Sequence, residues 1–259
     1  SFCARGNSEF KFMSLAHHLN IDFLRDCYNN LDRNKAVGID NVSWHEYGSN
    51  LEHNLERLVF KLKNKTYKPL PSKRVNIPKG NNELRPLGIS SIESKIVESG
   101  LTRILSSIYE ADFYDFSYGF RPNKSAHQAL KVIGDSINFK AVHYVVEADI
   151  KGFFDNVDHV ILLDFLRIRI GDSSLLILIE KFLKAGYVDA NKLIKTGMGT
   201  PQGSILSPLL SNIFLHHVLD KWFTDVVRNH TSCYVELVRY ADDFIVLAQN
   251  EYDATKILK

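Results

Sequence analysis

Two adjacent aspartates near the end of the chain, Asp242 and Asp243, stand in the stretch VRYADDFIVLA (238–248). Apolar residues that favour β-strands lie on both sides, so a strand, a tight turn and a second strand are predicted. Neighbouring carboxylates repel each other when both are ionised, unless a cation is present. The pair is either a polar turn, in which aspartate is common, or part of a site for a divalent cation.

A third acid, Asp149, follows the apolar run HYVVEA (143–148) and precedes the aromatic loop IKGFFD (150–155). We therefore expect Asp149 at the end of another buried strand. Mg²⁺ prefers hard oxygen ligands, and it commonly takes one or two protein carboxylates together with substrate phosphates. Three acids at the ends of strands are typical of a two-metal site for phosphoryl transfer.

The elements that must position these acids are predicted from hydrophobic periodicity and from turn residues. Helices are expected over residues 14–31, 42–67, 90–113, 125–138, 158–170, 173–187 and 207–227. Strands are expected over 74–78 and 84–89, around the turn KGNNE (79–83), over 143–150, and on both sides of the turn within 234–249. Residues 193–204, LIKTGMGTPQGS, form a glycine-rich loop. Helices and strands without a regular βαβ alternation predict an α+β fold.

Composition is that of a globular protein: 259 residues, 45% of them hydrophobic and 24% charged. No run of 18 apolar residues is present, so we expect no membrane span. Three distant cysteines argue against a disulfide framework and fit a reducing, cytosolic compartment. The stretch from Arg57 to Arg85 contains nine basic residues and a single acid, Glu83. This stretch is either a solvated face or a surface for a phosphate backbone.

Five stretches, in order, carry a resemblance to reverse transcriptases encoded by group II introns, which also serve as splicing maturases. They are IPKGNNELRPLGI (77–89), ADFYDFSYGFRPNKSAHQAL (111–130), EADIKGFFDNVDH (147–159), GTPQGSILSPLLSNIFLHHVLD (199–220) and RYADDF (239–244). A lone YxDD is weak evidence, whereas five ordered motifs are specific. The resemblance covers roughly residues 20–250 and implies a right-hand polymerase fold. Its fingers would occupy 1–143, with an N-terminal helical extension. Its palm would occupy 144–259, with a small antiparallel sheet packed on helices.

The resemblance assigns roles to the acids. Asp149 resembles the palm aspartate that, together with Asp242, holds two Mg²⁺ ions, and Asp243 resembles the adjacent acid of the same cluster. The backbone carbonyl of Ile150 would be a further metal ligand. One ion would activate the primer 3′-hydroxyl, and the other would neutralise the triphosphate and the departing pyrophosphate.

The resemblance also assigns nucleotide-binding residues. Lys79 and Arg85 resemble the fingers residues that clamp the incoming triphosphate, as a point charge and a forked donor. Phe154 stands where such enzymes carry an aromatic steric gate against the 2′-hydroxyl. Gln202 resembles a residue of the loop against nucleotide and template. Simpler interpretations remain: Lys79 as part of the basic stretch, and Phe154 as core packing.

The motif SYGFRP (117–122) places aromatic residues beside Arg121. Contact with the template is one interpretation. Packing of Tyr118 and Phe120 is the other, and the sequence favours it slightly.

The implied partners are an RNA template or intron RNA, a DNA primer and dNTPs. The implied location is the cytoplasm of a bacterium, with no membrane as partner. Whether the protein forms a homodimer remains open. Three alternatives also remain: a two-metal nuclease, an RNA-binding maturase without polymerase activity, and a CRISPR-associated or other group II-like reverse transcriptase. Sixteen residues follow Asp243. We therefore expect a palm cut short after the YADD hairpin, no helical thumb, and weak polymerisation by this chain alone.

Overall fold

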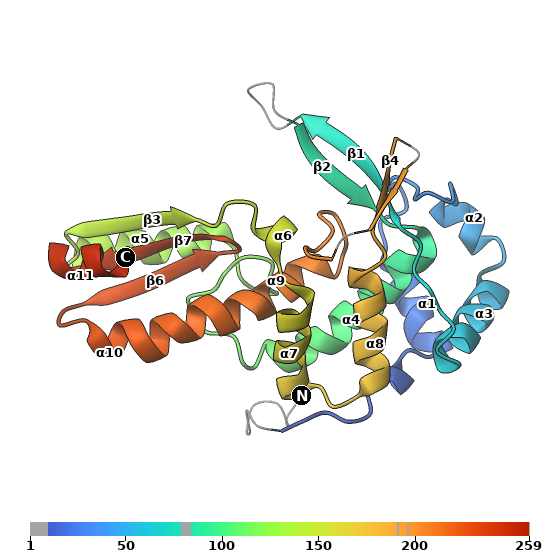
Figure 1. Ribbon diagram of the computed structural model, residues 1–259, viewed down its shortest axis with the longest axis horizontal. Helices are drawn as coiled ribbons and strands as arrows, with labels where there is room; N and C mark the ends of the chain where they lie inside the picture. Colours follow the sequence, from blue (N-terminus) through green and yellow to red (C-terminus); the bar gives the residue numbers. More distant parts are fainter. Residues whose placement is uncertain (1–9, 79–83, 191, 196, 259) are drawn as a thin grey trace. The chain divides into compact units, whose positions relative to one another are not determined.

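The computed structural model describes residues 10–78, 84–190, 192–195 and 197–258, and confirms the predicted mixture of helices and sheets (Figure 1). The chain forms two compact units. The first joins Ser1–Ile108 to Phe154–Leu210, and the second joins Tyr109–Phe153 to Ser211–Lys259. This division by compactness differs from the expected functional division at residue 144, which stays a prediction.

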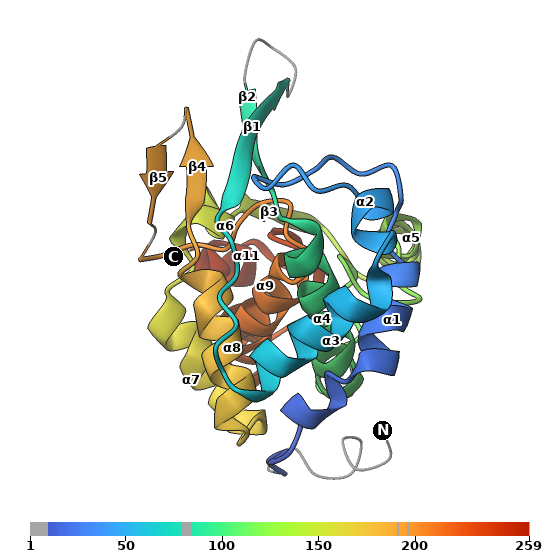
Figure 2. The same ribbon diagram turned by 90° about the vertical axis from the view of Figure 1, so that its right-hand side faces the viewer.

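Helices are the main secondary structure of the first unit (Figure 2). They are η1 (Ala16–His18), α1 (Ile21–Asn29), α2 (Trp44–Gly48), α3 (Leu51–Lys63), α4 (Ile92–Tyr109, whose last residue belongs to the second unit), α7 (His159–Arg169) and α8 (Ser173–Leu183). Their apolar faces meet in a core that includes the fully buried side chains of Leu24, Leu55, Leu101 and Leu162. Helical spacing of apolar residues predicted α3, α4 and α7. The prediction of one helix over 42–67 is wrong, because a turn at residues 49–50 separates α2 from α3 and α3 ends at Lys63.

The N-terminal helix is shorter than the sequence predicts. The prediction of one helix over 14–31 is wrong, because a 3₁₀ turn, η1, precedes α1 and the chain is extended at Asn20 between them. The side chain of Asn20 accepts a hydrogen bond from the amide of Phe23 and so caps the N-terminus of α1. A local cap of this kind competes with a continuous helix.

Asp172 ties the start of the described chain to α8. One carboxylate oxygen accepts from the amides of Leu15 and Ala16, at 2.7 and 2.8 Å. The other accepts from Ser174 and Leu175, at 2.9 and 3.3 Å, as the N-cap of α8. Although burial opposes it, these four N–H donors hold the pKa of Asp172 below its usual value.

Asp172→Asn should therefore lower the free energy of unfolding at pH 7, by about 1–3 kcal/mol. The stabilisation by ionised Asp172 is present above the ordinary aspartate pKa and is lost as pH falls through the lower folded-state value. The gap between the two proteins should thus shrink below about pH 4. Urea denaturation at pH 7 and pH 3 measures it. Asp164→Asn, at an exposed acid of α7, is the control. A gap that persists unchanged at pH 3 would contradict the prediction.

A four-stranded sheet, ordered β2-β1-β4-β5, completes the first unit. β1 (Ser72–Pro78) and β2 (Leu84–Ile89) are antiparallel, and they confirm the predicted strand pair; the turn 79–83 lies outside the described residues. β4 (Tyr187–Asp189) and β5 (Lys192–Ile194) were not predicted. The prediction of a helix continuing to Tyr187 is wrong, because α8 ends at Leu183. Gly186 then takes a φ of +72°, which glycine adopts readily.

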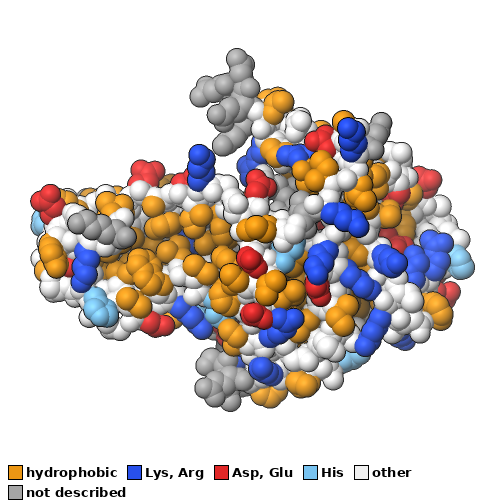
Figure 3. Space-filling view, viewed as in Figure 1, with side chains coloured by type: hydrophobic (Ala, Val, Ile, Leu, Met, Phe, Trp, Pro, Cys, Tyr) orange, Lys and Arg blue, Asp and Glu red, His pale blue; other side chains and the backbone are white. Residues whose placement is uncertain are grey.

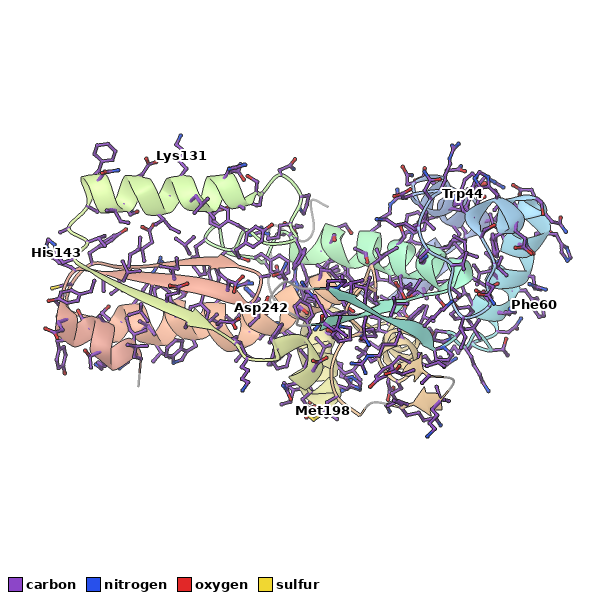
Figure 4. The ribbon with its side chains drawn as sticks, turned by 90° about the horizontal axis from the view of Figure 1, so that it is seen from above. Trp44, Phe60, Lys131, His143, Met198 and Asp242 are labelled. Carbon is purple, nitrogen blue, oxygen red and sulfur yellow. The ribbon has the colours of Figure 1, made fainter. Side chains whose placement is uncertain are left out.

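The second unit is a three-stranded antiparallel sheet between two layers of helix (Figure 4). The strands are ordered β3 (Tyr144–Asp149), β7 (Asp243–Ala248) and β6 (Val235–Tyr240). α5 (Ala126–Phe139) covers one face, where Ala129 packs against Val238. The helical residues 211–230 and α11 (Glu251–Ile257) cover the other face, where Phe223 and Ala254 contact the strands. The short helix α6 (Phe153–Asn156) follows β3.

The helix predicted over 207–227 contains two widened turns. α9 (Ser207–Leu215) is followed by the π-helical segments η2 (His216–Asp220) and η3 (Phe223–Val227), and then by α10 (Arg228–His230). Such π-helical turns are rare and frequently lie at functional sites. Asp220, the last residue of η2, has no solvent exposure.

The surface divides by side-chain type. Figure 3 shows Lys and Arg side chains spread over the face of the first unit that carries α3 and α8, and hydrophobic side chains gathered over the part that carries β3, β6 and β7. None of the described helices is both long enough and apolar enough to cross a bilayer.

Candidate active site

The YADD motif forms the tightest kind of hairpin turn. Tyr240 pairs with Asp243, which leaves a two-residue loop of Ala241 and Asp242 between β6 and β7. Figure 4 labels Asp242 at this end of the hairpin. Ala241 has a φ of +59°, a value that primed two-residue turns require at this position. A residue other than glycine pays about 1–2 kcal/mol for that conformation.

Strand register brings the third acid to this turn. Asp149 is the last residue of β3 and lies directly opposite Asp243, the first residue of β7. Residues directly opposite each other in antiparallel strands point to the same face, with Cβ atoms roughly 5 Å apart. Both side chains are exposed, and Asp242 is partly buried. The structure therefore brings all three predicted acids to one end of one sheet.

This set of donors fits a divalent metal. Among the described residues no Lys or Arg forms an ion pair with Asp149 or Asp243, and like charges directly opposite each other are destabilising. The described side chains also contain no group of three His, Cys, Asp or Glu already arranged around one point. Carboxylate side chains would thus have to rotate toward a shared ion. Their hard oxygens are the ligands that Mg²⁺ prefers. The carbonyl of Ile150 accepts a hydrogen bond from the amide of Phe153 and retains a second lone pair.

A buried arginine is hydrogen-bonded to the backbone of the turn. Arg239 has no solvent exposure, and its Nε and one terminal nitrogen donate to both carboxylate oxygens of Asp220, at 2.7 and 2.6 Å. Its other terminal nitrogen donates to Asn212 Oδ1 at 3.0 Å and to the carbonyl of Ala241 at 2.9 Å. Burial raises the pKa of Asp220, and the guanidinium opposes that rise. One side chain thus links the strained residue of the turn to a buried carboxylate.

The SYGFRP motif lies against the same strand. The amide of Tyr118 donates to the carbonyl of Arg239 at 2.8 Å, and the amide of Arg239 donates to Phe116 at 2.9 Å. Tyr118 is buried, which agrees with the packing interpretation, whereas Phe120 is exposed, so that interpretation is wrong for Phe120. Arg121 is also buried, pairs with Glu110 at 3.0 Å and donates to the backbone. Its guanidinium is therefore occupied within the unit, which does not favour the template-contact interpretation.

Gly119 packs closely against the backbone of the turn. A Cβ at this position would lie 2.3 Å from the backbone nitrogen of Ala241, so no larger residue fits without a shift. The carbonyl of Gly119 accepts a hydrogen bond from Asn212 Nδ2 at 2.8 Å. Phe120, exposed, places its ring 6.5 Å from that of Tyr240.

Two of the predicted nucleotide-binding residues meet in the first unit. Arg85 Nε donates to Gln202 Oε1 at 3.1 Å, and the amide of Gly88 donates to the carbonyl of Gln202 at 2.6 Å. Gly203 has a φ of +106°, and a Cβ there would lie 2.6 Å from the carbonyl oxygen of Gly88. The backbone of the TPQG loop therefore packs directly against the backbone of strand β2. Lys79 lies outside the described residues.

The TPQG loop is fixed at both of its ends. The amide of Thr200 donates to the carbonyl of Phe154 at 2.7 Å. Glu98 of α4 accepts from the amide of Ile205 at 2.9 Å and from Ser90 at 2.8 Å. Because Glu98 is buried, its pKa is raised. Neither contact was expected from the sequence, since each depends on residues far apart in the chain.

A cavity of about 240 Å³ opens beside this loop. Its lining includes Leu87 and Gly88 of β2, Gln202, Asp155 and the ring of Tyr187. Mixed apolar walls with a few polar groups are typical of a binding site for a small molecule or a base.

The basic stretch between Arg57 and Arg85 is partly paired. Lys61 contacts Glu93 at 3.3 Å. Arg74 contacts Asp189 at 3.9 Å and stacks over the ring of Tyr187 at 4.5 Å. Lys63, Lys65, Lys68 and Lys73 are exposed. Both interpretations of this stretch, a solvated face and a phosphate-binding surface, therefore remain.

Sequence reasoning missed the residues that hold the turn. Asp220, Asn212 and Gly119 all lie within motifs that were quoted, but no role was assigned to them. The available signal was Arg239, an arginine in a strand that otherwise has to be buried. A buried charge needs a partner, and this requirement points to Asp220.

Comparisons with known proteins agree with the motifs. The family model described as "Reverse transcriptase (RNA-dependent DNA polymerase)" matches residues 77–259. The group II intron-encoded protein LtrA of Lactococcus lactis subsp. cremoris is 44% identical over 196 residues, which cover 75% of this chain and 32% of LtrA. Protein YkfC of Escherichia coli (strain K12) is 32% identical, over 82% of this chain and 63% of YkfC. The chain thus spans about a third of the length of LtrA.

A solved structure shares the fold. A chain of the "Partial Cas6-RT-Cas1–Cas2 complex" superposes with a TM-score of 0.54 and 23% identity, over 92% of this chain and 38% of that chain. The family match covers most of the sequence, and the relatives named as intron-encoded proteins confirm the resemblance that the five motifs carry. The chain belongs to the reverse transcriptase (RNA-dependent DNA polymerase) family.

Proposed function

We propose that this chain is the reverse transcriptase domain of a group II intron-encoded maturase, which copies RNA into DNA by adding dNTPs to a primer 3′-hydroxyl. The observation that carries the proposal is the register of Asp149 opposite Asp243, with Asp242 in the adjoining turn. Phosphoryl transfer needs little beyond positioned cations and aligned reactants. An end of a rigid sheet that presents three carboxylates supports that chemistry.

Asp149 and Asp242 would hold two Mg²⁺ ions, with Asp243 beside them and the Ile150 carbonyl as a further ligand. When bound, such ions activate the attacking hydroxyl and neutralise charge on the leaving group. The protein's part is to fix the carboxylates. The six paired positions of β3 and β7 support this role, because they end at Asp149 and Asp243 and lead directly into the turn that carries Asp242.

Arg85 and Gln202 would bind the incoming nucleotide, with Lys79 as the second cation. Support comes from the Arg85–Gln202 hydrogen bond and from the cavity beside β2. Arg85 presents a forked donor that suits phosphate oxygens. Gln202 offers an amide to a sugar or base, and its own backbone is anchored to Gly88.

Phe154 would exclude ribonucleotides by filling the space that a 2′-hydroxyl needs. Phe154→Val should raise the preference for rNTPs over dNTPs, as the ratio of their kcat/KM values, by about 10–100-fold. The reason is that a smaller side chain removes the clash without removing a contact to the deoxyribose. Single-nucleotide incorporation measures the ratio. Phe60→Val, at an exposed ring of α3, should leave it unchanged. An unchanged ratio in Phe154→Val would assign this ring to packing alone.

We propose fingers over residues 1–143 and a palm over residues 144–259. Strands β3, β7 and β6 fit a small antiparallel palm sheet packed on helices. The partners we propose are an RNA template, including intron RNA, a DNA primer and dNTPs.

A group II-like enzyme of a CRISPR system is the second candidate. The superposition on the "Partial Cas6-RT-Cas1–Cas2 complex" favours it. Its chemistry would be the same, and only its RNA and protein partners would differ. The exposed lysines between Lys63 and Lys73 would support RNA binding in either setting.

The test is primer extension on an RNA template with dNTPs and Mg²⁺. Extension that stops when Mg²⁺ is chelated supports the proposal. Cleavage of the template instead would support a two-metal nuclease. RNA binding with neither reaction would support a non-catalytic maturase module. Binding of an intron RNA should weaken steeply as salt is raised, because it rests on phosphate contacts.

A further inference from the structure

We propose that Arg239, fixed by Asp220 and Asn212, is a positioning residue that holds the Ala241–Asp242 turn in the conformation that presents the carboxylates. This inference deepens the proposed function and rests on it. Arg239 has no solvent exposure, so its side chain is not open to a bound substrate. It acts on Asp242 through the backbone of the residue before it.

The first step of the argument is the strain in the turn. Ala241 has a φ of +59°, where L-residues other than glycine are disfavoured. Such a conformation persists only where the surroundings over-determine it, and it clusters at functional sites. The hydrogen bond from Arg239 to the carbonyl of Ala241, at 2.9 Å, is a contact that constrains this residue directly.

The second step is that Arg239 is itself immobile. Two of its nitrogens form parallel bonds to the carboxylate of Asp220, at 2.7 and 2.6 Å, and neither side chain has solvent exposure. A bidentate pair of this kind fixes the plane of the guanidinium as well as its place. Asp220 ends the π-helical segment η2, where the helix departs from regular geometry.

The third step is a link to a second backbone segment. Asn212 accepts from Arg239 at 3.0 Å and donates to the carbonyl of Gly119 at 2.8 Å. Gly119 in turn packs against the backbone of Ala241, with no room for a Cβ. Arg239 thus holds the turn through a hydrogen bond, and Gly119 holds it through backbone packing. Asn212 is hydrogen-bonded to both residues.

A purely structural ion pair is the competing explanation. It would account for the bonds between Arg239 and Asp220, but it does not require the bonds to Ala241 and Asn212. A lysine separates the two roles. It keeps the positive charge beside Asp220, and it lacks the planar fork that reaches three acceptors at once.

The experiment compares Arg239→Lys with the unmodified chain in hydrogen exchange, Mn²⁺ binding and the Mg²⁺ dependence of primer extension. We expect exchange at the amides of residues 241–243 to rise at least about 10-fold, while the amides of residues 245–247 change little. We expect the half-saturating concentrations of Mn²⁺ and Mg²⁺ to rise about 10–100-fold, as is usual when a group that orients metal ligands is lost.

Two controls make the result specific. Leu237→Val removes a buried methylene group two residues away in the same strand, and it should lower thermal stability without moving the metal dependence. Arg25→Lys changes a bidentate but exposed pair with Glu52 in the first unit, and it should change neither. If Arg239→Lys fails to fold, Asn212→Ser provides a milder test, because it removes one acceptor of Arg239 and the link to Gly119 while the buried charges stay paired, and it should raise exchange at residues 241–243 by a smaller factor.

Two outcomes would count against the idea, and they are distinguishable. Unchanged exchange at 241–243 and unchanged Mn²⁺ binding in Arg239→Lys would overturn the positioning role, whatever the protein's activity. Failure of the unmodified chain both to bind Mn²⁺ and to extend a primer would overturn the proposed function, and with it the purpose of holding this turn.

Discussion

Asp149→Asn and Asp242→Asn should each reduce the rate of primer extension by at least about 10³-fold, which corresponds to about 4 kcal/mol of transition-state stabilisation. Asparagine has the shape of aspartate but lacks its charge, so the site loses attraction for a divalent cation without losing volume. Both residues belong to the proposed metal site. The reductions in rate should therefore be far from additive in the double variant. Single-turnover extension at saturating Mg²⁺ measures the effect.

The fold should survive both changes. Asp149 and Asp243 lie directly opposite each other with like charge, so Asp149→Asn removes a repulsion and should leave the melting temperature equal or slightly higher. Asp115→Asn, at an exposed acid of the same unit that pairs with Lys124, should leave both activity and stability near their starting values. Extension reduced by less than about 10-fold in Asp149→Asn would contradict the role of this residue as a metal ligand.

Breaking the buried ion pair should have the largest effect on stability. Arg239→Met leaves the carboxylate of Asp220 buried without its guanidinium, which should cost about 3–5 kcal/mol of unfolding free energy. The structural basis is that both side chains have no exposure and share two hydrogen bonds. Urea denaturation followed by circular dichroism measures the loss.

The double variant Arg239→Met/Asp220→Leu tests the reason for that loss. Replacing both charges with apolar side chains of similar size removes the unpaired carboxylate, so much of the stability should return. Primer extension should not return with it, because no donor then reaches the carbonyl of Ala241. Recovery of both properties together would show that the pair only stabilises the fold. Exposed Arg167→Met, which loses a surface pair with Asp164, should cost less than about 1 kcal/mol.

The sequence by itself determined the parts of this protein that depend on local patterns. Alternating or continuous apolar runs predicted β1, β2, β3 and the β6–β7 hairpin, because side chains in a strand repeat every two residues. Helical spacing predicted α4, α5 and α7. The five motifs predicted the family, and the placement of acids at strand ends predicted Asp149, Asp242 and Asp243 as one set.

Predictions from local patterns were wrong where a helix ends before its helical spacing of apolar residues does. Residues 14–31 have helical spacing, yet the Asn20 cap divides them. Residues 173–187 read as one helix, yet Gly186 and pairing with Ser72 turn Tyr187 into the start of a strand. In both cases a cap or a partner strand outweighs a difference in propensity that is typically below 1 kcal/mol per residue.

Only the tertiary structure decided what holds the site. The register that places Asp149 opposite Asp243, the bond from Arg85 to Gln202 and the contacts of Arg239 with Asp220 and Asn212 join residues that lie far apart in sequence. No periodicity encodes such pairs, because each forms only when whole faces of strands and helices have packed. The sequence predicts which groups would do the chemistry, whereas the packed core determines which groups hold them in place.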